Sequence, residues 1–223
     1  GDDMTIQGLL LDFDGTLLDS EPWHHQAWNA VLWEHQIQFT EAQYMELLVG
    51  HSTAHCAAIV NRHFGTSFAE KWLVDTVDAQ VNEWFHSRPL PENSEVETLL
   101  RWSRKAGLRV AVVTGSSRLL VETALERTGW QQLIELIVAD DDVQHGKPHP
   151  EGYLAALQQF GLEPEAAVAI EDSATGAAAA LAAGVACLIC SNRFTDQQSF
   201  PEDTHRIRSL QDAQRWIGER LAE

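Results

Sequence analysis

The chain has 223 residues, of which 44% are hydrophobic, and it carries 15 basic and 33 acidic side chains, which give a formal net charge of −18. This length and apolar content suffice for one large domain or for a core domain into which a smaller one is inserted. The strongly acidic balance argues against a nucleic acid or an anionic membrane surface as a partner, since both would repel the chain.

Five short apolar runs predict buried strands, at residues 8–13, 109–114, 136–139, 166–170 and 185–190. Helical patterns lie between and after the later strands. The first of them starts at a capping-box spacing of Ser94 and Glu97 and stops at Gly107, and the others cover residues 121–128, 150–161 and 210–221. Strands that alternate with helices of this length indicate an α/β fold, a doubly wound parallel sheet with helices on both faces.

The alternation fails from about residue 18 to residue 88, where only helical periodicity is present. Pro22 precedes this stretch, and Pro89 and Pro91 follow it, so that both ends are suited to be hinges. We therefore expect an all-helical cap domain of about four helices at residues 18–91, inserted into a core domain made of residues 1–17 and 92–223.

Polar side chains follow four of the predicted strands where each strand ends. In open parallel sheets, ligands bind beyond the carboxyl ends of the strands, so these groups are expected to meet in one site. Two like-charged aspartates separated by one residue also need a proton or a cation between them. The four groups are Asp12 with Asp14, Thr114-Gly115-Ser116, Gly146-Lys147, and Glu171-Asp172.

This set of side chains suits phosphate chemistry. Asp12 and Asp172 offer the carboxylate oxygens that Mg²⁺ takes together with water and a substrate phosphate. The Lys147 ammonium, the Thr114 hydroxyl and helix N-terminal amides at Gly115 and Ser116 are suited to hold phosphate oxygens. One aspartate is then placed to attack phosphorus as a nucleophile, and a second carboxylate to move a proton to or from the leaving oxygen.

The segments DFDGT, VVTGSS, GKPHP and AIEDS, in this order, resemble the four signature motifs of the haloacid dehalogenase superfamily, and the helical insert resembles that of its β-phosphoglucomutase-like phosphatases. The resemblance implies that Asp12 forms an aspartyl-phosphate and that Asp14 protonates the leaving group and later activates water. It also implies that Mg²⁺ is bound by Asp12, by the backbone carbonyl of Asp14 and by Asp172. Thr114 and Lys147 would hold the phosphate, and Glu171 would lie beside the ion, either as a ligand or, as we favour, as a residue that supports the ligands.

The same resemblance assigns a substrate contact in the cap to His24, with His25 as the alternative. Relatives with mutase activity also place an arginine shortly after a glycine of the cap, but the segment Gly50-His51-Ser52-Thr53 contains none. Hydrolysis needs no second anchor for a bisphosphate. We therefore expect a Mg²⁺-dependent phosphatase that acts on a small phosphorylated metabolite, in first place a sugar phosphate.

Three other functions remain open at this stage. A sugar phosphomutase would form an isomer in the presence of a bisphosphate activator. A haloalkanoate dehalogenase would use Asp12 without a metal and would not need Asp14. A phosphoacceptor signalling module also combines carboxylates, a hydroxyl and a lysine on a doubly wound sheet, but it resembles a chain of about 120 residues with its acceptor aspartate on a later strand.

Several other patterns are expected to be structural. Thr16 should tie the turn after the first strand, and the acidic run at residues 140–142 should be a solvated loop rather than a second metal site. The histidine pairs 51/55 and 145/149 have the spacing of zinc ligands, but neither has an evident third ligand. Cys187 and Cys190 should be buried thiols, because positions three apart on a strand face opposite sides.

The three cysteines are too few for a disulfide framework, and no secretory pattern or run of about 18 apolar residues is present. We therefore expect a cytoplasmic protein without a membrane partner, and a monomer whose partner is a small-molecule phosphate ester.

Overall fold

The computed structural model describes residues 5–222. Residues 1–4 and 223, which belong to the predicted core segments, lie outside the described part. The strands are β1 (Gly8–Leu11), β2 (Arg109–Val113), β3 (Leu136–Val138), β4 (Ala167–Glu171), β5 (Ala186–Ile189) and β6 (His205–Arg206). The α-helices are α1 (Glu21–Leu32), α2 (Glu41–Leu47), α3 (Thr53–Phe64), α4 (Glu70–Ser87), α5 (Val96–Lys105), α6 (Arg118–Thr128), α7 (Glu151–Phe160), α8 (Ala174–Ala182) and α9 (Leu210–Gly218). Short 3₁₀ helices are η1 (Trp33–His35), η2 (Trp130–Leu133), η3 (Asp140–Asp142) and η4 (Pro164–Ala166).

Within residues 5–222 the strands form a six-stranded sheet in the order β3-β2-β1-β4-β5-β6, and every pair is parallel. The first strand lies at the centre, where Gly8 pairs with Arg109 of β2 on one side and with Ala167 of β4 on the other. The chain order therefore reverses at β1, and this is the position at which doubly wound sheets bind ligands. The predicted fold class is confirmed.

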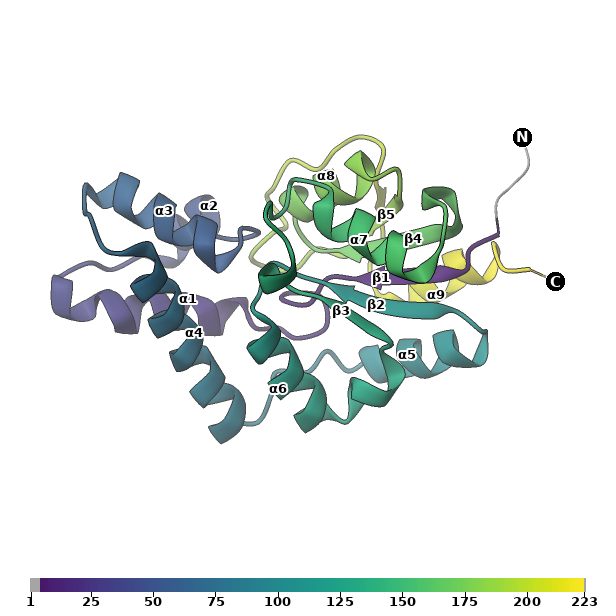
Figure 1. The fold of residues 1–223 in the computed structure, drawn as a ribbon, viewed down its shortest axis with the longest axis horizontal. Helices are drawn as coiled ribbons and strands as arrows, with labels where there is room; N and C mark the ends of the chain where they lie inside the picture. Colours follow the sequence, from purple (N-terminus) through teal and green to yellow (C-terminus); the bar gives the residue numbers. More distant parts are fainter. Residues whose placement is uncertain (1–4, 223) are drawn as a thin grey trace.

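Helices cover both faces of the sheet, as Figure 1 shows, with α7 and α8 on one face and α5, α6 and α9 on the other. Alternate residues of β1 explain this arrangement, because Leu10 packs with α7 and α8 whereas Leu9 and Leu11 belong to the opposite core. All three leucines are fully buried. A strand that buries both of its faces reads as a continuous apolar run, which is the pattern on which the prediction rested.

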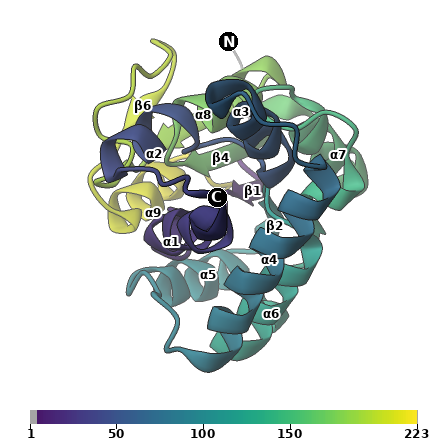
Figure 2. The ribbon, with the colours of Figure 1, turned by 90° about the vertical axis from the view of Figure 1, so that its left-hand side faces the viewer.

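Helices α1 to α4 stand together beyond the carboxyl ends of the strands, and Figure 2 views the molecule from their side. Helix α4 packs along α6 of the sheet region. Phe13, which follows β1, is fully buried and packs edge-on against Phe85 of α4 at 6.5 Å between ring centroids. The side chain of Arg127 in α6 also donates hydrogen bonds to the carbonyls of Phe85 and Arg88. The C-terminal end of α4 is thus joined to the sheet region by an apolar contact and by hydrogen bonds from α6.

Element ends differ in detail from the predictions. The predicted capping box at Ser94 is wrong, because α5 begins one residue later with Glu95 at its N-cap and has no side-chain cap bond. The side chain of Asn93 instead accepts from the Glu95 N–H. Strand β4 includes Glu171, which the sequence analysis placed after the strand. Strand β6 has only two residues, both exposed, and therefore carries no periodic apolar signal.

None of the helices within residues 5–222 combines the length and the hydropathy that a membrane crossing requires.

Candidate active site

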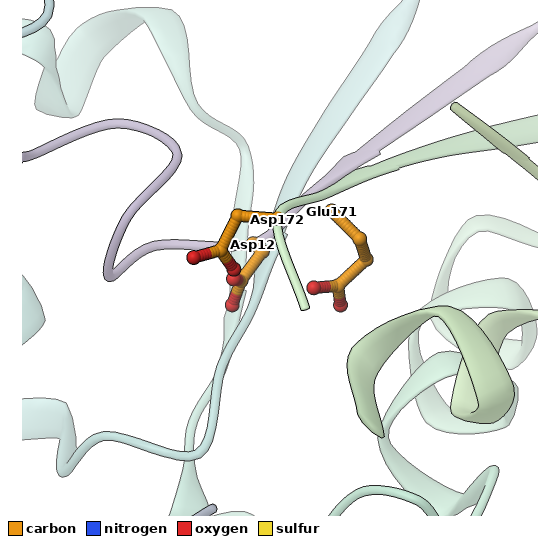
Figure 3. A group of neighbouring side chains, drawn as sticks. All are labelled: Asp12, Glu171 and Asp172. Atoms are coloured by element: carbon orange, nitrogen blue, oxygen red, sulfur yellow. The ribbon is translucent and has the colours of Figure 1, made fainter. Parts of the chain in front are cut away.

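The carboxyl ends of the central strands β1 and β4 bring three carboxylates together. The Asp12 N–H donates to the Ile170 carbonyl of β4, so the residues that follow both strands lie side by side. One oxygen from each of Asp12, Glu171 and Asp172 lies within 4.8 Å of the others. In Figure 3 the Asp12 and Asp172 carboxylates lie next to each other, and the Glu171 side chain leaves the strand on the other side with its carboxylate bent back toward them. Segments some 160 positions apart therefore form one acidic pocket.

The charges of this carboxylate group need compensation. Asp12 is 7% exposed and Asp172 is 3% exposed. Burial, followed by the charge of Asp12, raises the pKa of Asp172 well above its usual value. A divalent cation relieves this repulsion, and an all-oxygen set of two carboxylates suits Mg²⁺. The residues present therefore fit the ion that the sequence pattern implies.

Two neighbours keep the Asp172 carboxylate in place. The amide of Asn192, which follows β5, donates to Asp172 Oδ2 at 3.0 Å and to the Gly15 carbonyl at 3.1 Å. Gly15 has a φ of +81°, and a Cβ at this position would collide with the Asp172 carboxylate. The glycine after the two aspartates is thus required both by the turn and by the close approach of Asp172.

Glu171 is fully buried, and two donors hold one of its carboxylate oxygens, while within residues 5–222 its buried Oε2 has no hydrogen-bond partner. Its Oε1 accepts from Lys147 Nζ at 2.6 Å and also from the Tyr153 hydroxyl. A Cβ on Gly176 of α8 would overlap the same carboxylate, so this glycine provides the space for it. Glu171 is thus in contact with Lys147 and α8, and one of its oxygens also lies within 4.8 Å of the Asp12 and Asp172 carboxylates, so the geometry is compatible with a metal ligand as well as with a supporting residue.

Lys147 connects these carboxylates. Its ammonium donates to Asp12 Oδ1 at 3.0 Å and to the Val113 carbonyl at 2.8 Å, besides Glu171. Burial alone would lower the pKa of Lys147, but the Asp12 and Glu171 carboxylates outweigh it and raise the pKa above its usual value. Lys147 is therefore a fixed positive charge directly beside Asp12.

The turn after β2 differs from the expectation. Helix α6 begins at Arg118 with Ser117 at its N-cap, so Gly115 and Ser116 precede the helix rather than form its first turn. The Ser116 N–H donates to the Thr114 hydroxyl at 3.0 Å and is already paired. Thr114, Gly115 and Ser116 nevertheless line the same pocket as Asp12 and Lys147. The expected helix N-terminal position of these amides is corrected, whereas their place in the pocket agrees with the expectation.

Asp14 receives three hydrogen bonds across the pocket. Ser20 donates to its Oδ1 at 2.6 Å, His24 Nε2 lies 2.7 Å from the same oxygen, and the Ser116 hydroxyl donates to its Oδ2. Burial alone would raise the pKa of Asp14, but His24 and the hydroxyl donors outweigh it and lower the pKa to about 2. Burial likewise acts to lower the pKa of His24, but Asp14 raises it to about 9. The two side chains therefore share one proton at neutral pH.

His24 enters the pocket from α1 and so brings the helical segment into contact with the strand ends. The alternative candidate, His25, is turned elsewhere, because its Nε2 pairs with the Phe39 carbonyl at 2.8 Å. Thr16 does not line this pocket. Its hydroxyl has no hydrogen-bond partner within residues 5–222, and only its backbone N–H ties the turn, through the Phe13 carbonyl.

Several residues in or beside the pocket were missed by the sequence analysis. Asn192, which bonds to Asp172 from beside the pocket, follows β5, and the strand-end rule used for the other strands would have found it. Glu21, Tyr44 and Leu48 come from the helical segment and line the pocket, as does Trp28, whose position just past Pro22 suggested such a place from sequence. Positions on a helix face carry no comparable sequence signal.

The remaining candidate patterns are structural. Asp142 accepts from Arg118 at 2.6 Å and Asp141 accepts from the Arg118 N–H, so this acidic run caps α6. Within the described part of the chain, the carboxylates of Asp12, Glu171 and Asp172 form the only group of three potential ligands, and neither histidine pair gains a third one. Cys187 and Cys190 are free thiols whose pKa values are raised, in the first place by burial.

Comparison with known proteins finds the same organisation elsewhere. Residues 6–184 match the family model of haloacid dehalogenase-like hydrolases. The chain is 33% identical over 190 residues to the fructose-1-phosphate phosphatase YqaB of Escherichia coli, which covers 80% of this chain and 93% of the relative. Among solved structures, CbbY from Rhodobacter sphaeroides in complex with phosphate superposes with a TM-score of 0.85 at 26% identity and covers 92% of this chain and 95% of that chain.

A mutant of CbbY, with the same TM-score of 0.85 and 26% identity, was solved in complex with xylulose-(1,5)bisphosphate. The β-phosphoglucomutase of Clostridium difficile superposes with a TM-score of 0.80, covering 96% of this chain and 98% of that chain, but its 16% identity supports the shared fold alone.

Proposed function

The chain belongs to the haloacid dehalogenase-like hydrolases, and we propose on this basis that it is a Mg²⁺-dependent phosphatase that hydrolyses a small phosphorylated sugar through an aspartyl-phosphate on Asp12. One observation carries this proposal: Lys147 Nζ lies 3.0 Å from Asp12 Oδ1 in a buried pocket that Asp172 also lines. The similarity to a fructose-1-phosphate phosphatase supports both the reaction and the class of substrate.

Residues 18–91 act as a cap domain in this proposal, and the residues on either side form the core. The core residues Asp12, Thr114 and Lys147 bind the phosphoryl group, and the cap faces the part of the substrate that leaves. Support for this division comes from the position of α1 to α4 beyond the carboxyl ends of the strands (Figure 1). A substrate in the pocket would therefore lie between the two.

Asp12 is the nucleophile in the first step. Its carboxylate attacks phosphorus, the bond from phosphorus to the leaving oxygen breaks, and a phosphoryl-aspartate results. Lys147 and the Thr114 hydroxyl hold the phosphoryl oxygens, with Gly115 and Ser116 shaping the turn around them. The carboxylates of Asp12 and Asp172 and the backbone carbonyl of Asp14 would hold Mg²⁺, which would supply positive charge to offset the charge of the phosphoryl group.

Asp14 handles the proton of the reaction. An acid has to be protonated before it donates, whereas the pKa of Asp14 lies at about 2 and that of His24 at about 9. We infer that the proton held between the two side chains passes to Asp14 as negative charge develops on the leaving oxygen. After the alcohol leaves, Asp14 takes a proton from water, and the resulting hydroxide attacks phosphorus and releases Asp12.

Hydrolysis fits this pocket better than phosphoryl transfer between two positions of a sugar. Gly50, His51, Ser52 and Thr53 line the pocket, and within residues 5–222 no arginine does. A mutase has to retain a bisphosphate intermediate at both of its ends, and a second phosphate would find no guanidinium here. This composition supports the phosphatase over the mutase.

Phosphate release from fructose 1-phosphate tests the proposal. Activity should depend on added Mg²⁺, should disappear with a chelator, and should fall by about a thousandfold or more in Asp12→Asn, because an amide is a poor nucleophile. The exposed Asp203 offers a matched control, and Asp203→Asn should retain full activity. Full activity of Asp12→Asn, or activity that a chelator leaves unchanged, would remove the proposed mechanism.

A further inference from the structure

Glu21 is a buried carboxylate in the cap wall of the pocket, and the mechanism above does not use it. It is the first residue of α1, is only 8% exposed and lines the same pocket as Asp12 and Asp14. Its Oε2 accepts a hydrogen bond from the Tyr44 hydroxyl at 2.7 Å. Within residues 5–222 its other oxygen has no hydrogen-bond partner, and this oxygen is not closed off from the pocket that the residue lines. The free oxygen is thus available to a group that enters the pocket.

The cap wall offers no free positive charge beside this carboxylate. In the described part of the chain, the basic side chains that line the pocket are His24, His51 and Lys147. Lys147 is bound to Asp12 and Glu171, and His24 to Asp14. Burial, followed by the neighbouring His55, lowers the pKa of His51, so this imidazole is neutral at pH 7.

Above pH 7 Glu21 is ionised, because its pKa lies at about 7, and a second anion on the substrate would then meet a carboxylate and no free cation. Like charges brought together in a desolvated site cost several kcal/mol. A hydroxyl group, in contrast, donates a hydrogen bond to the unpaired oxygen, and hydrogen bonds to charged acceptors are the more stabilising ones. Trp28, which is 2% exposed and lines the same pocket, adds an apolar surface. The C–H groups of a polyol can pack against such a surface.

We propose that Glu21 is a specificity-determining residue that accepts a hydrogen bond from a hydroxyl of the leaving group. The pocket then selects monophosphates of neutral polyhydroxylated compounds and rejects esters whose leaving group carries a carboxylate or a second phosphate. This inference rests on the proposed phosphatase function. It separates the chain from CbbY, a mutant of which was solved with a bisphosphate in spite of the shared fold.

Two matched substrate pairs test the inference with the Mg²⁺-loaded enzyme at pH 8, where Glu21 is ionised. Glucitol 6-phosphate and 6-phosphogluconate differ only in a hydroxymethyl group against a carboxylate, and fructose 1-phosphate differs from fructose 1,6-bisphosphate by the second phosphate. We expect kcat/KM for the neutral member of each pair to exceed that of the charged member by about a hundredfold or more. p-Nitrophenyl phosphate, whose leaving group has no sugar hydroxyl, reports on the core chemistry alone.

The variant Glu21→Gln should reduce both preferences by about tenfold or more, because the amide keeps the shape but removes the charge. Tyr44→Phe keeps the ring and frees the second Glu21 oxygen, so both preferences should remain. Glu46→Gln, an exposed change on the cap helix α2, should alter neither ratio. The ratio of two kcat/KM values within one preparation does not depend on the fraction of folded enzyme.

The outcomes separate the two proposals. Equal kcat/KM for neutral and charged substrates, or ratios that Glu21→Gln leaves as they are, would overturn the role of Glu21 while phosphate release continues. Absence of phosphate release from every substrate, p-nitrophenyl phosphate included, would overturn the phosphatase function and with it this inference.

Discussion

The two walls of the pocket are built on different principles. On the core side, Asp12, Lys147 and Asp172 stand at or just beyond strand ends or in loops, and Lys147 compensates the charges of Asp12 at 3.0 Å and of Glu171 at 2.6 Å. On the cap side, Glu21 and Tyr44 come from faces of two helices, and the carboxylate there has one neutral donor. In the proposed function, the fixed charges of the core hold the phosphate, while the Glu21 contact of the cap selects the group attached to it.

Burial affects the two walls in opposite ways. Lys147 remains positive, since its carboxylate neighbours outweigh burial and raise its pKa. Glu21 has no cation in direct contact, so that burial in the first place raises its pKa to about 7, although the charge of His24 acts to lower it. The free-energy cost of removing a charge from water is compensated by ion pairs in the core and left partly uncompensated in the cap. Substitutions in the core should therefore affect catalysis and folding together, whereas those in the cap should mainly affect which substrate is accepted.

The largest effect is expected for Lys147→Met, which keeps the length of the side chain and removes the charge. Asp12 and Glu171 lose their buried partner, and this should lower the free energy of unfolding by about 3 kcal/mol. Phosphatase activity should fall at least about a hundredfold, since the phosphoryl oxygens lose a charged donor. Urea unfolding in a chelator, which prevents a divalent ion from replacing the ammonium, measures the first effect.

Lys71→Met is the matched control on the cap. Lys71 pairs with Asp75 in the next turn of α4, but its side chain is 87% exposed, so the urea midpoint and the activity should not change. A Lys147→Met protein as stable as the wild type would mean that the core carboxylates are compensated by something other than this lysine, and the contrast between the two walls would lose its basis.

The difference between the walls also explains what could be predicted from sequence. Strands buried on both faces leave continuous apolar runs, and polar residues directly after them, such as Asp12 and Asp172, must gather at one edge of a parallel sheet. The order and direction of the strands therefore suffice to predict that Asp12 and Asp172 meet on the core side of the pocket. Glu21 meets Tyr44 only because α1 and α2 pack at a particular angle, and no local pattern encodes such an angle. The two-residue strand β6 is too short to produce a signal.

The pH dependence of stability gives a second way to sharpen the comparison, because His24 joins the two walls. Its pKa is raised from 6.5 to about 9 in the folded protein, so its contribution is complete below pH 6.5 and is lost as the pH rises to about 9. The loss should amount to at most about 3 kcal/mol. The acidic groups that act on His24 are Asp14, Glu21 and Asp78.

The comparison of wild type with His24→Gln isolates this contribution. Glu21 and Glu171 have pKa values raised, in the first place by burial, to about 7 and about 8, and they also weaken folding as the pH rises, but both remain in the variant. We expect the free energy of unfolding, measured with urea between pH 6 and pH 9.5, to fall more steeply in the wild type. If the unfolding free energies of wild type and variant fell equally with pH, the pKa of His24 would not be raised by Asp14, and the proposed shared proton would be ruled out.

The smallest effect is expected where the two parts of the molecule meet at the surface. Arg193, in the loop after β5, forms a bidentate ion pair with Glu41 of α2, but the two side chains are 62% and 48% exposed. Solvent and salt screen such a pair, so Arg193→Ala should change kcat/KM by less than about twofold. The contact between cap and core then depends on buried apolar groups such as Phe13 and Phe85, both fully buried. A large loss of activity in Arg193→Ala, or in the wild type at 0.5 M NaCl, would instead make this exposed ion pair the contact that holds the cap over the core.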